Sequence, residues 1–363
     1  MRIDEVRVEI LEVPFRAPFV SGSQGWEHVR VGIVVLHADD HRVGLGEFPA
    51  PRPNDLGEDA SPRLIEELTG MDLGDPVAVE GALRRIDRLP FVGRAARSAV
   101  ESALVDLVAQ ANGRSISTHL DVEAAADVAL NAVLGIGPPE EATAEAARLV
   151  TLGYRCLKLK AGDESEGALR TRVAAVREAV GPEVALRLDF NGSLGSDEAP
   201  DVLASLAPYE LEYVEQPIPP SAGAEALARL RWGGSVPIAA DESVRDLGTA
   251  RVLLDTGAVD ALVVKPARVG GLRQARAIVE VAMASSVPVT VSTLFETGVG
   301  IAGALHLAAT VPGPQAHGLA TADLLETDLL RTSLAIDAGR MRVPDGVGLG
   351  IELDPQAIVR YRA

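Results

Sequence analysis

The chain has 363 residues, of which 47 % are hydrophobic and 24 % charged, and its formal net charge at pH 7 is -18. This composition predicts a globular protein of about two domains and excludes a disordered or fibrous chain. The negative charge and the lack of any Lys/Arg-rich stretch argue against nucleic acid as a partner, because phosphate groups would be repelled. Any site for an anionic small molecule must therefore carry local positive charge.

No segment of the sequence has the pattern of an export signal or a membrane span. Residues 1–15 alternate charged and apolar side chains, and no run reaches the roughly 18 apolar residues of a membrane helix. The single cysteine, Cys156, lies within an apolar run and excludes an intrachain disulfide. We expect a cytoplasmic protein with no membrane partner, and the sequence leaves open whether it forms a homo-oligomer.

The first third of the chain has the pattern of an α+β unit. Between residues 61 and 113 the apolar positions recur with the 3.6-residue period of helices. Residues 21–26 combine small side chains with Trp26 and suit either a mobile lid or an ordinary connecting loop. An antiparallel meander is predicted before and after them by alternation with period two, in residues 3–15, 29–36 and 43–48.

From about residue 129, apolar runs alternate with amphipathic helical stretches such as 166–180 and 272–284. This alternation predicts an α/β fold, a (β/α)8-type, TIM-like barrel whose active site lies at the carboxyl ends of its strands. The predicted strands are 129–134, 154–160, 184–190, 211–215, 236–240, 260–265, 287–293 and 316–319.

After about residue 335 the alternation stops, and the tail has the pattern of a hairpin. We expect this tail to pack against the N-terminal unit. The predicted domains are therefore an α+β capping domain of residues 1–125, completed by residues 335–363, and a catalytic barrel of residues 126–334.

Three carboxylates end the third, fourth and fifth predicted strands: Asp189, Glu215 and Asp241. At adjacent strand ends they would repel one another unless a positive group lay between them. A hard divalent ion such as Mg²⁺ takes oxygen ligands and resolves that repulsion. Asn191 and Glu242 lie beside two of these ligands and suit hydrogen bonds that support them. The alternative is three unrelated helix caps or salt-bridge acids.

Lys158 and Lys160 lie on one face of the second predicted strand, because side chains alternate along a strand. A neighbouring like charge and partial burial lower the pKa of a lysine toward the range of a general base. Lys160, nearer the strand end, is the expected base and Lys158 its electrostatic partner. Lys265 ends the sixth strand, roughly across the ring from the second. Alternatively, each lysine extends to the surface.

Together these groups suit one class of reaction on a small-molecule carboxylate. A metal that binds the substrate carboxylate, with an amine on either side, favours removal of the proton from the adjacent carbon. The ion would stabilise the enediolate that forms. A barrel that only binds or supports, without catalysis, is the non-enzymatic alternative.

The same residues lie in LKLKAG (Lys158 and Lys160), LRLDFNG (Asp189 and Asn191), VEQP (Glu215), ADES (Asp241 and Glu242) and VVKPARVGG (Lys265). This ordered set resembles the enolase superfamily, specifically its muconate cycloisomerase subgroup. The resemblance runs nearly end to end, since RSAVESALVDLVAQANG and VPDGVGLGIELD are similar to other parts of that family. It implies Mg²⁺, with Mn²⁺ as a substitute, on Asp189, Glu215 and Asp241, and Lys160 and Lys265 as the acid/base pair.

Within the subgroup, the segment HGLATADLLETDLL looks most like o-succinylbenzoate synthases of menaquinone biosynthesis. That resemblance implies a dehydration in which Lys160 removes the α-proton and returns it to the leaving hydroxyl, while cationic Lys265 steadies the intermediate. N-acylamino acid racemases, dipeptide epimerases and muconate cycloisomerases share the catalytic set. An Asp-x-Asp pair, which dipeptide epimerases use, is replaced here by Thr321-Ala322-Asp323, which disfavours that activity.

Gly298-x-Gly300-x-x-Gly303 formally matches a dinucleotide-binding fingerprint. No second strand ending in an acid follows at the required distance, so we exclude NAD binding. Two interpretations remain open. The amides at this helix start, beside Ser292 and Thr293, receive a second substrate carboxylate, or the glycines allow close packing of helix on strand.

Overall fold

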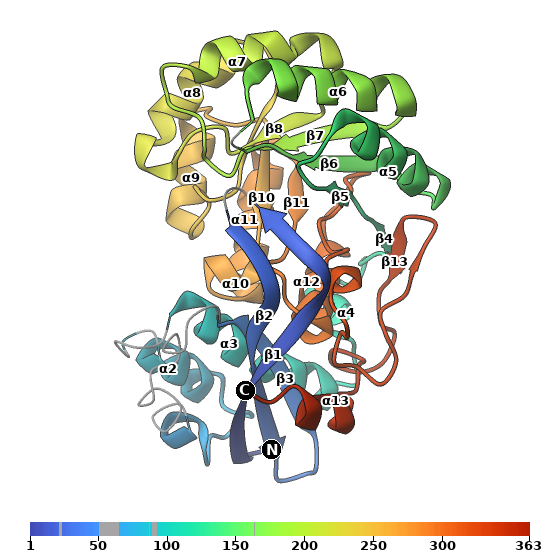
Figure 1. The fold of residues 1–363 in the computed structure, drawn as a ribbon. Coiled ribbons are helices and arrows are strands. Elements are labelled where there is room, and N and C mark those ends of the chain that lie inside the picture. The colour runs from blue at the N-terminus through green and yellow to red at the C-terminus, as the bar shows by residue number, and fades with distance from the viewer. Residues whose placement is uncertain (22–23, 51–64, 87, 89–92, 163) are drawn as a thin grey trace.

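The computed structural model of the protein describes residues 1–21, 24–50, 65–86, 88, 93–162 and 164–363. An antiparallel sheet with its helices lies at one end of the molecule, and a ring of parallel strands surrounded by helices lies at the other (Figure 1). The C-terminal helix lies beside the N-terminal sheet.

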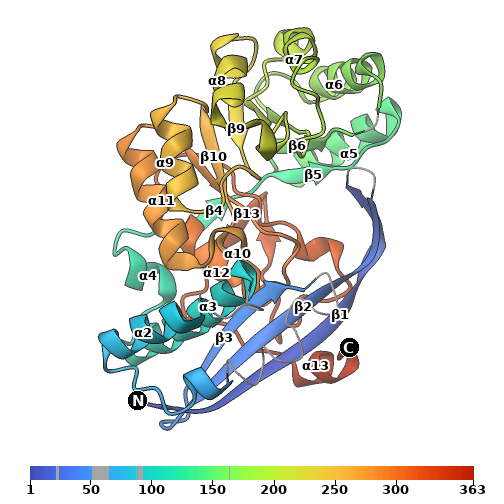
Figure 2. The ribbon, with the colours of Figure 1, turned by 90° about the vertical axis from the view of Figure 1, so that its left-hand side faces the viewer.

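Three antiparallel strands in the order β1-β2-β3 form the N-terminal sheet and confirm the predicted meander. β1 and β2 stay paired as far as Ser21 and Gln24, and their distal half rises from the sheet to the barrel (Figure 2). Of the predicted lid or loop, Gly22 and Ser23 lie outside the described residues, whereas Trp26 belongs to β2. The strands are β1 (Ile3–Ser21), β2 (Gln24–Ala38) and β3 (Val43–Pro49).

A long helix packs directly on β3 because two glycines remove the side chains between them. A Cβ atom on Gly46 would lie 1.8 Å from the carbonyl oxygen of Ala99, and one on Gly44 would lie 2.2 Å from that of Ala103. The close contact buries an apolar core between this helix and the sheet. The helices of this region are α2 (Pro76–Ile86), α3 (Arg94–Ala111) and α4 (Ile116–Leu120).

The barrel confirms the predicted fold class. Among the described residues, seven parallel strands pair in the order β11-β10-β9-β8-β7-β6-β5. Apolar side chains such as Leu157, Leu186 and Val214 are fully buried against the helices outside the ring, so the alternate positions face the interior. The strands are β5 (Ala132–Leu134), β6 (Cys156–Lys160), β7 (Ala185–Asp189), β8 (Tyr213–Glu215), β9 (Ile238–Ala240), β10 (Ala261–Val264) and β11 (Val289–Val291).

Helices follow the strands around the ring, and no helix in the described part of the chain is long and apolar enough to cross a membrane. The helices are α5 (Pro139–Thr151), α6 (Glu166–Val180), α7 (Ala199–Leu206), α8 (Ala224–Trp232), α9 (Leu247–Asp255), α10 (Pro266–Val269), α11 (Leu272–Ala284) and α12 (Gly298–Ala308). Short 3-10 turns are η1 (Ala207–Tyr209), η2 (Pro220–Ala222) and η3 (Ala322–Leu324).

The first and eighth predicted strands differ from expectation. Residues 129–134 do not form one strand, because the Leu130 amide donates to Gly339 in the tail while the Asn131 amide donates to His317 in the ring. The chain therefore changes sheets there, from β4 (Asp127–Ala129) to β5. Residues 316–319 close the ring only through isolated parallel bridges, from His317 to Leu130 and from Gly318 to Ser292.

The tail makes two kinds of contact. β12 (Ile336–Asp337) and β13 (Arg340–Arg342) form a hairpin that pairs with β4. Further on, the Leu349 amide donates to Asp106 of α3 at 2.8 Å. The last residues, with α13 (Pro355–Arg360), return to β1. The division into residues 1–125 with 335–363 and residues 126–334 stays a prediction, since strand pairing between β13 and β4 crosses it.

Candidate active site

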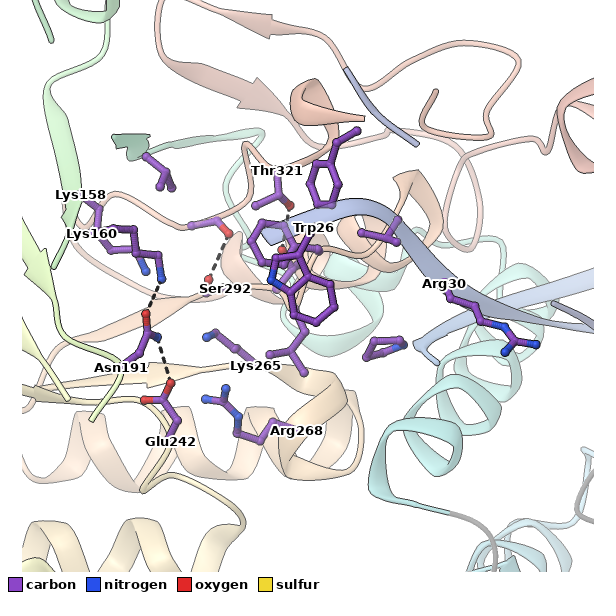
Figure 3. A pocket seen from close by; sticks show the side chains of 18 of the residues that line it. Trp26, Arg30, Lys158, Lys160, Asn191, Glu242, Lys265, Arg268, Ser292 and Thr321 are labelled. Carbon is purple, nitrogen blue, oxygen red and sulfur yellow. Dashed lines mark hydrogen bonds between the residues drawn. The ribbon is translucent and has the colours of Figure 1, made fainter. Parts of the chain in front are cut away.

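A cavity of about 770 Å³ lies between the carboxyl ends of the barrel strands and the N-terminal sheet. Lys160 and Lys265 line it from the barrel, and Phe15, Trp26 and Arg30 line it from β1 and β2 (Figure 3). The predicted site residues either line this cavity or, like the three carboxylates, contact the lysines that line it.

Lys158 and Lys160 lie side by side on β6, each only 7 % exposed. Lys158 Nζ lies 3.0 and 3.2 Å from the two carboxylate oxygens of Glu215 and 3.2 Å from Asp189 Oδ2. Burial disfavours its charge, but the carboxylates of Glu215 and Asp189 hold the pKa of Lys158 well above its ordinary value. For Lys158 this direction is opposite to the lowering expected of a buried lysine, because the carboxylates outweigh burial.

Lys160 is held by two oxygen acceptors. Its Nζ donates to Asp189 Oδ2 at 2.7 Å and to Asn191 Oδ1 at 2.9 Å. Asn191 Nδ2 in turn donates to Glu242 Oε1 at 3.0 Å, so three side chains form one hydrogen-bonded chain along the cavity wall (Figure 3). The other carboxylate oxygen of Glu242 is buried and has no hydrogen-bond partner among the residues that the structure describes.

The three predicted metal-binding carboxylates are fully buried at adjacent strand ends, and Asp189 pairs in register with Glu215. Burial and the charges of Asp189 and Asp241 raise the pKa of Glu215 to about 7, although Lys158 opposes them. Burial would also raise the pKa of Asp189, but the charges of Lys158 and Lys160 hold it below its ordinary value. The repulsion expected from the sequence is thus present, and lysines offset part of it.

Lys265 lies across the ring from Lys160, and its Nζ is 2.6 Å from Asp241 Oδ2. Arg268, one turn further along in α10, contacts the other oxygen of Asp241. Despite burial, these two cations hold the pKa of Asp241 below its ordinary value. Sequence reasoning missed Arg268, although its place three residues after Lys265 puts it on the same side of a helical turn.

The donor chemistry of this cluster fits a hard divalent cation. Oxygen ligands predominate, burial and the charges of Asp189 and Asp241 raise the pKa of Glu215, and one buried oxygen of Glu242 has no hydrogen-bond partner in the described part of the chain. In the arrangement described, however, each carboxylate contacts an ammonium or guanidinium group. Accordingly, no three His, Cys, Asp or Glu side chains in the described ranges are placed to hold a metal.

Ser292 and Thr293 line the cavity, as expected of substrate-binding residues. Their hydroxyl groups already have protein partners. Ser292 Oγ donates to the Gly318 carbonyl at 3.2 Å, and Thr293 Oγ1 lies 3.1 Å from Thr321 Oγ1. Their role in binding stays a prediction.

The amides at the start of α12 do not face a substrate. The Thr297 and Gly300 amides donate to the carboxylate of Glu47, at 2.6 and 2.7 Å. The interpretation that these amides receive a second substrate carboxylate is therefore wrong, because an acid of β3 already occupies them. Sequence reasoning missed Glu47, whose only signal is a charge within an apolar strand.

A sequence model described as enolase C-terminal domain-like matches residues 141–357. The chain is 38 % identical over 239 residues to o-succinylbenzoate synthase of Thermobifida fusca, an alignment covering 63 % of this chain and 72 % of that protein. It is 34 % identical over 368 residues to N-succinylamino acid racemase of Thermus thermophilus, covering 97 % of this chain and 95 % of that protein.

A solved structure of similar fold is that of a dipeptide epimerase from Enterococcus faecalis, complexed with Mg and the dipeptide L-Leu-L-Tyr. It superposes with a TM-score of 0.88 at 27 % identity, covering 97 % of this chain and all of that one. With the barrel and the ordered lysines and carboxylates, these similarities show that the chain is an enzyme that belongs to the enolase superfamily, in its muconate cycloisomerase subgroup.

Proposed function

We propose that this enzyme is a Mg²⁺-dependent o-succinylbenzoate synthase, which removes the proton next to a substrate carboxylate and eliminates water. The main observation in favour of this proposal concerns two lysines. Lys160 and Lys265 lie on opposite sides of the ring and line one cavity, next to three buried carboxylates. The 38 % identity to the Thermobifida fusca synthase supports this choice of substrate.

Lys160 is the proposed base because its amine is fixed from two sides by Asp189 and Asn191. A fixed amine needs little further ordering when the substrate arrives. Its nitrogen takes the α-proton, and the electron pair of that C–H bond moves to the substrate carboxylate as an enediolate. Lys160 then returns the proton to the leaving hydroxyl, the C–O bond breaks, a C=C bond forms and water departs.

Lys265 has the complementary role. Its ammonium group is anchored by Asp241 at 2.6 Å and lines the same cavity, so it presents positive charge to the intermediate. Asp189, Glu215 and Asp241 would hold Mg²⁺, which supplies electrostatic stabilisation of the charge that develops on the substrate carboxylate.

The direct test is to incubate the purified protein and Mg²⁺ with the cyclohexadiene precursor and to follow formation of the aromatic product by absorbance. We expect turnover by the wild type and near-total loss in a Lys160→Ala variant that keeps its thermal unfolding midpoint. Absence of dehydration by the folded wild type with Mg²⁺ would refute the assignment.

A racemase of N-succinyl amino acids is the second candidate, and one geometric observation favours it. Lys160 and Lys265 are equally buried and face the cavity from different strands, as two-base proton transfer requires. The 34 % identity to the Thermus thermophilus racemase supports it. Exchange of the α-hydrogen of N-succinyl amino acids for solvent deuterium tests this candidate, which is discarded if neither enantiomer exchanges.

A further inference from the structure

Glu47 reaches from the N-terminal sheet into the first turn of a barrel helix. Its side chain is 5 % exposed. One carboxylate oxygen accepts from the Thr297 amide at 2.6 Å, and the other accepts from the Thr297 hydroxyl at 2.8 Å and the Gly300 amide at 2.7 Å. These groups begin α12, and a carboxylate there is favoured by the unpaired amides and the helix dipole. The acid thus serves as a helix cap that comes from the other part of the protein.

The surroundings leave this carboxylate little freedom. A Cβ atom on Gly300 would lie 3.2 Å from Glu47 Oε2 and 2.5 Å from the Cβ of Glu296. One on Gly298 would lie 2.5 Å from Leu330. The glycines noted in the sequence therefore have a packing reason, since each permits an approach that a side chain would block. Burial, with the charge of Glu296, raises the pKa of Glu47 to about 7 against the effect of its hydrogen bonds.

The segment just before this cap forms a wall of the cavity. Ser292, Thr293, Leu294 and Phe295 all line it. The Phe295 ring meets that of Phe15 on β1 edge to face, with 5.8 Å between ring centroids. The N-terminal sheet therefore holds the wall at two points, through an aromatic contact and through the Glu47 carboxylate.

A second buried acid also caps a barrel helix, away from the cavity, although unlike Glu47 it has an ion pair among the described residues, with Arg97 at 3.0 Å. Glu101 of α3, 1 % exposed, accepts from the Arg273 amide in the first turn of α11 at 2.7 Å. Neither Glu101 nor Arg273 lines the cavity. This acid joins the same two parts of the protein without touching the 292–297 segment, which makes it a matched control.

We propose that Glu47 is a positioning residue for substrate recognition, whose carboxylate fixes the 292–297 segment and thereby the cavity wall that this segment forms. The inference rests on the proposed function, because it assigns the substrate to this cavity. Leu294 and Phe295 give this wall an apolar character, and Phe15 and Trp26 of the N-terminal sheet line the same cavity, so the wall suits the uncharged portion of the substrate rather than its carboxylate.

The test compares Glu47→Gln with Glu101→Gln. An amide in place of the Glu47 carboxylate keeps the size but cannot accept from all the donors of α12. We expect KM to rise about tenfold while kcat changes less than threefold in Glu47→Gln, and both constants to stay within twofold of wild type in Glu101→Gln. Thr297→Val, which removes one of the donors, should give a smaller rise in KM and serves if Glu47→Gln fails to fold.

Hydrogen exchange supplies a readout independent of turnover. The Thr297 and Gly300 amides and the 292–296 segment should exchange faster in Glu47→Gln, and the Arg273 amide should not. An unchanged exchange pattern, an unchanged KM, a fall in kcat alone, or an equal rise of KM in Glu101→Gln each overturns the proposal. If the wild type turns over neither candidate substrate, the proposed function fails, whereas the exchange comparison still decides whether Glu47 positions the wall.

Discussion

Replacing Asn191 by glycine tests whether the hydrogen-bonded chain from Lys160 to Glu242 orients the base. The change removes the acceptor that lies 2.9 Å from Lys160 Nζ and the donor that lies 3.0 Å from Glu242 Oε1. Lys160 keeps its bond to Asp189. A hydrogen bond to a charged group contributes about 1.5–3 kcal/mol, so loss of the acceptor corresponds to about a 10- to 160-fold fall in kcat.

Glycine is the right replacement because of the backbone. Asn191 has φ of 48°, a left-handed conformation that asparagine and glycine adopt readily and alanine does not. Asn191→Ala therefore loses the same contacts and adds strain of about 1 kcal/mol or more. We expect equal loss of activity in the two variants and a lower unfolding free energy for alanine than for glycine.

The assay is the rate of α-proton loss at saturating substrate, measured by deuterium incorporation, together with urea unfolding monitored by circular dichroism. Activity of Asn191→Gly within twofold of wild type would refute the idea that this chain orients Lys160. A much lower activity in the less stable Asn191→Ala than in Asn191→Gly would refute it as well, because both variants lose the same side-chain contacts.

Three further outcomes are expected. Lys158→Met should destabilise the fold by about 3–5 kcal/mol in urea unfolding, because it leaves Glu215 buried without its partner cation; a change below 1 kcal/mol contradicts this. Chelation by EDTA should abolish turnover and added Mg²⁺ should restore it, and turnover that survives exhaustive chelation contradicts the metal assignment. Burial lowers the pKa of His306 to about 4, so the unfolded chain binds the extra proton first as the pH falls. The stability of wild type relative to His306→Gln should therefore be constant above pH 6.5 and decline from there toward pH 4, and a flat difference refutes the claim.

The order of the barrel strands was predictable because a charged residue interrupts an apolar run most often where a strand leaves the core. Lys160, Asp189 and Glu215 could thus be assigned to consecutive strands from spacing alone, and in the structure they are neighbours in register. The closure of the ring was not predictable to the residue, since bridges at His317 and Gly318 depend on partners far away in the sequence.

Buried charges with distant partners were harder to find. Arg187 lies within an apolar run, yet it is 1 % exposed inside the barrel, stacked over Tyr213 and bonded to Asn131 and the Ala316 carbonyl. The contact between Glu47 and Thr297 spans 250 positions. Local periodicity carries no information on such pairs, because it reports only which face of an element is buried.

Glu47 and Glu101 cap barrel helices from segments that are synthesised long before those helices. Glu101 and Arg273 are 172 positions apart in the sequence, and Glu47 and Thr297, just before α12, are 250 positions apart. The amides that they cap become available only when the last third of the chain emerges, so we expect final docking of the N-terminal sheet to be a late event in folding. A chimera that joins this barrel to another N-terminal region would need acids at both places, or α11 and α12 would begin with unpaired amides.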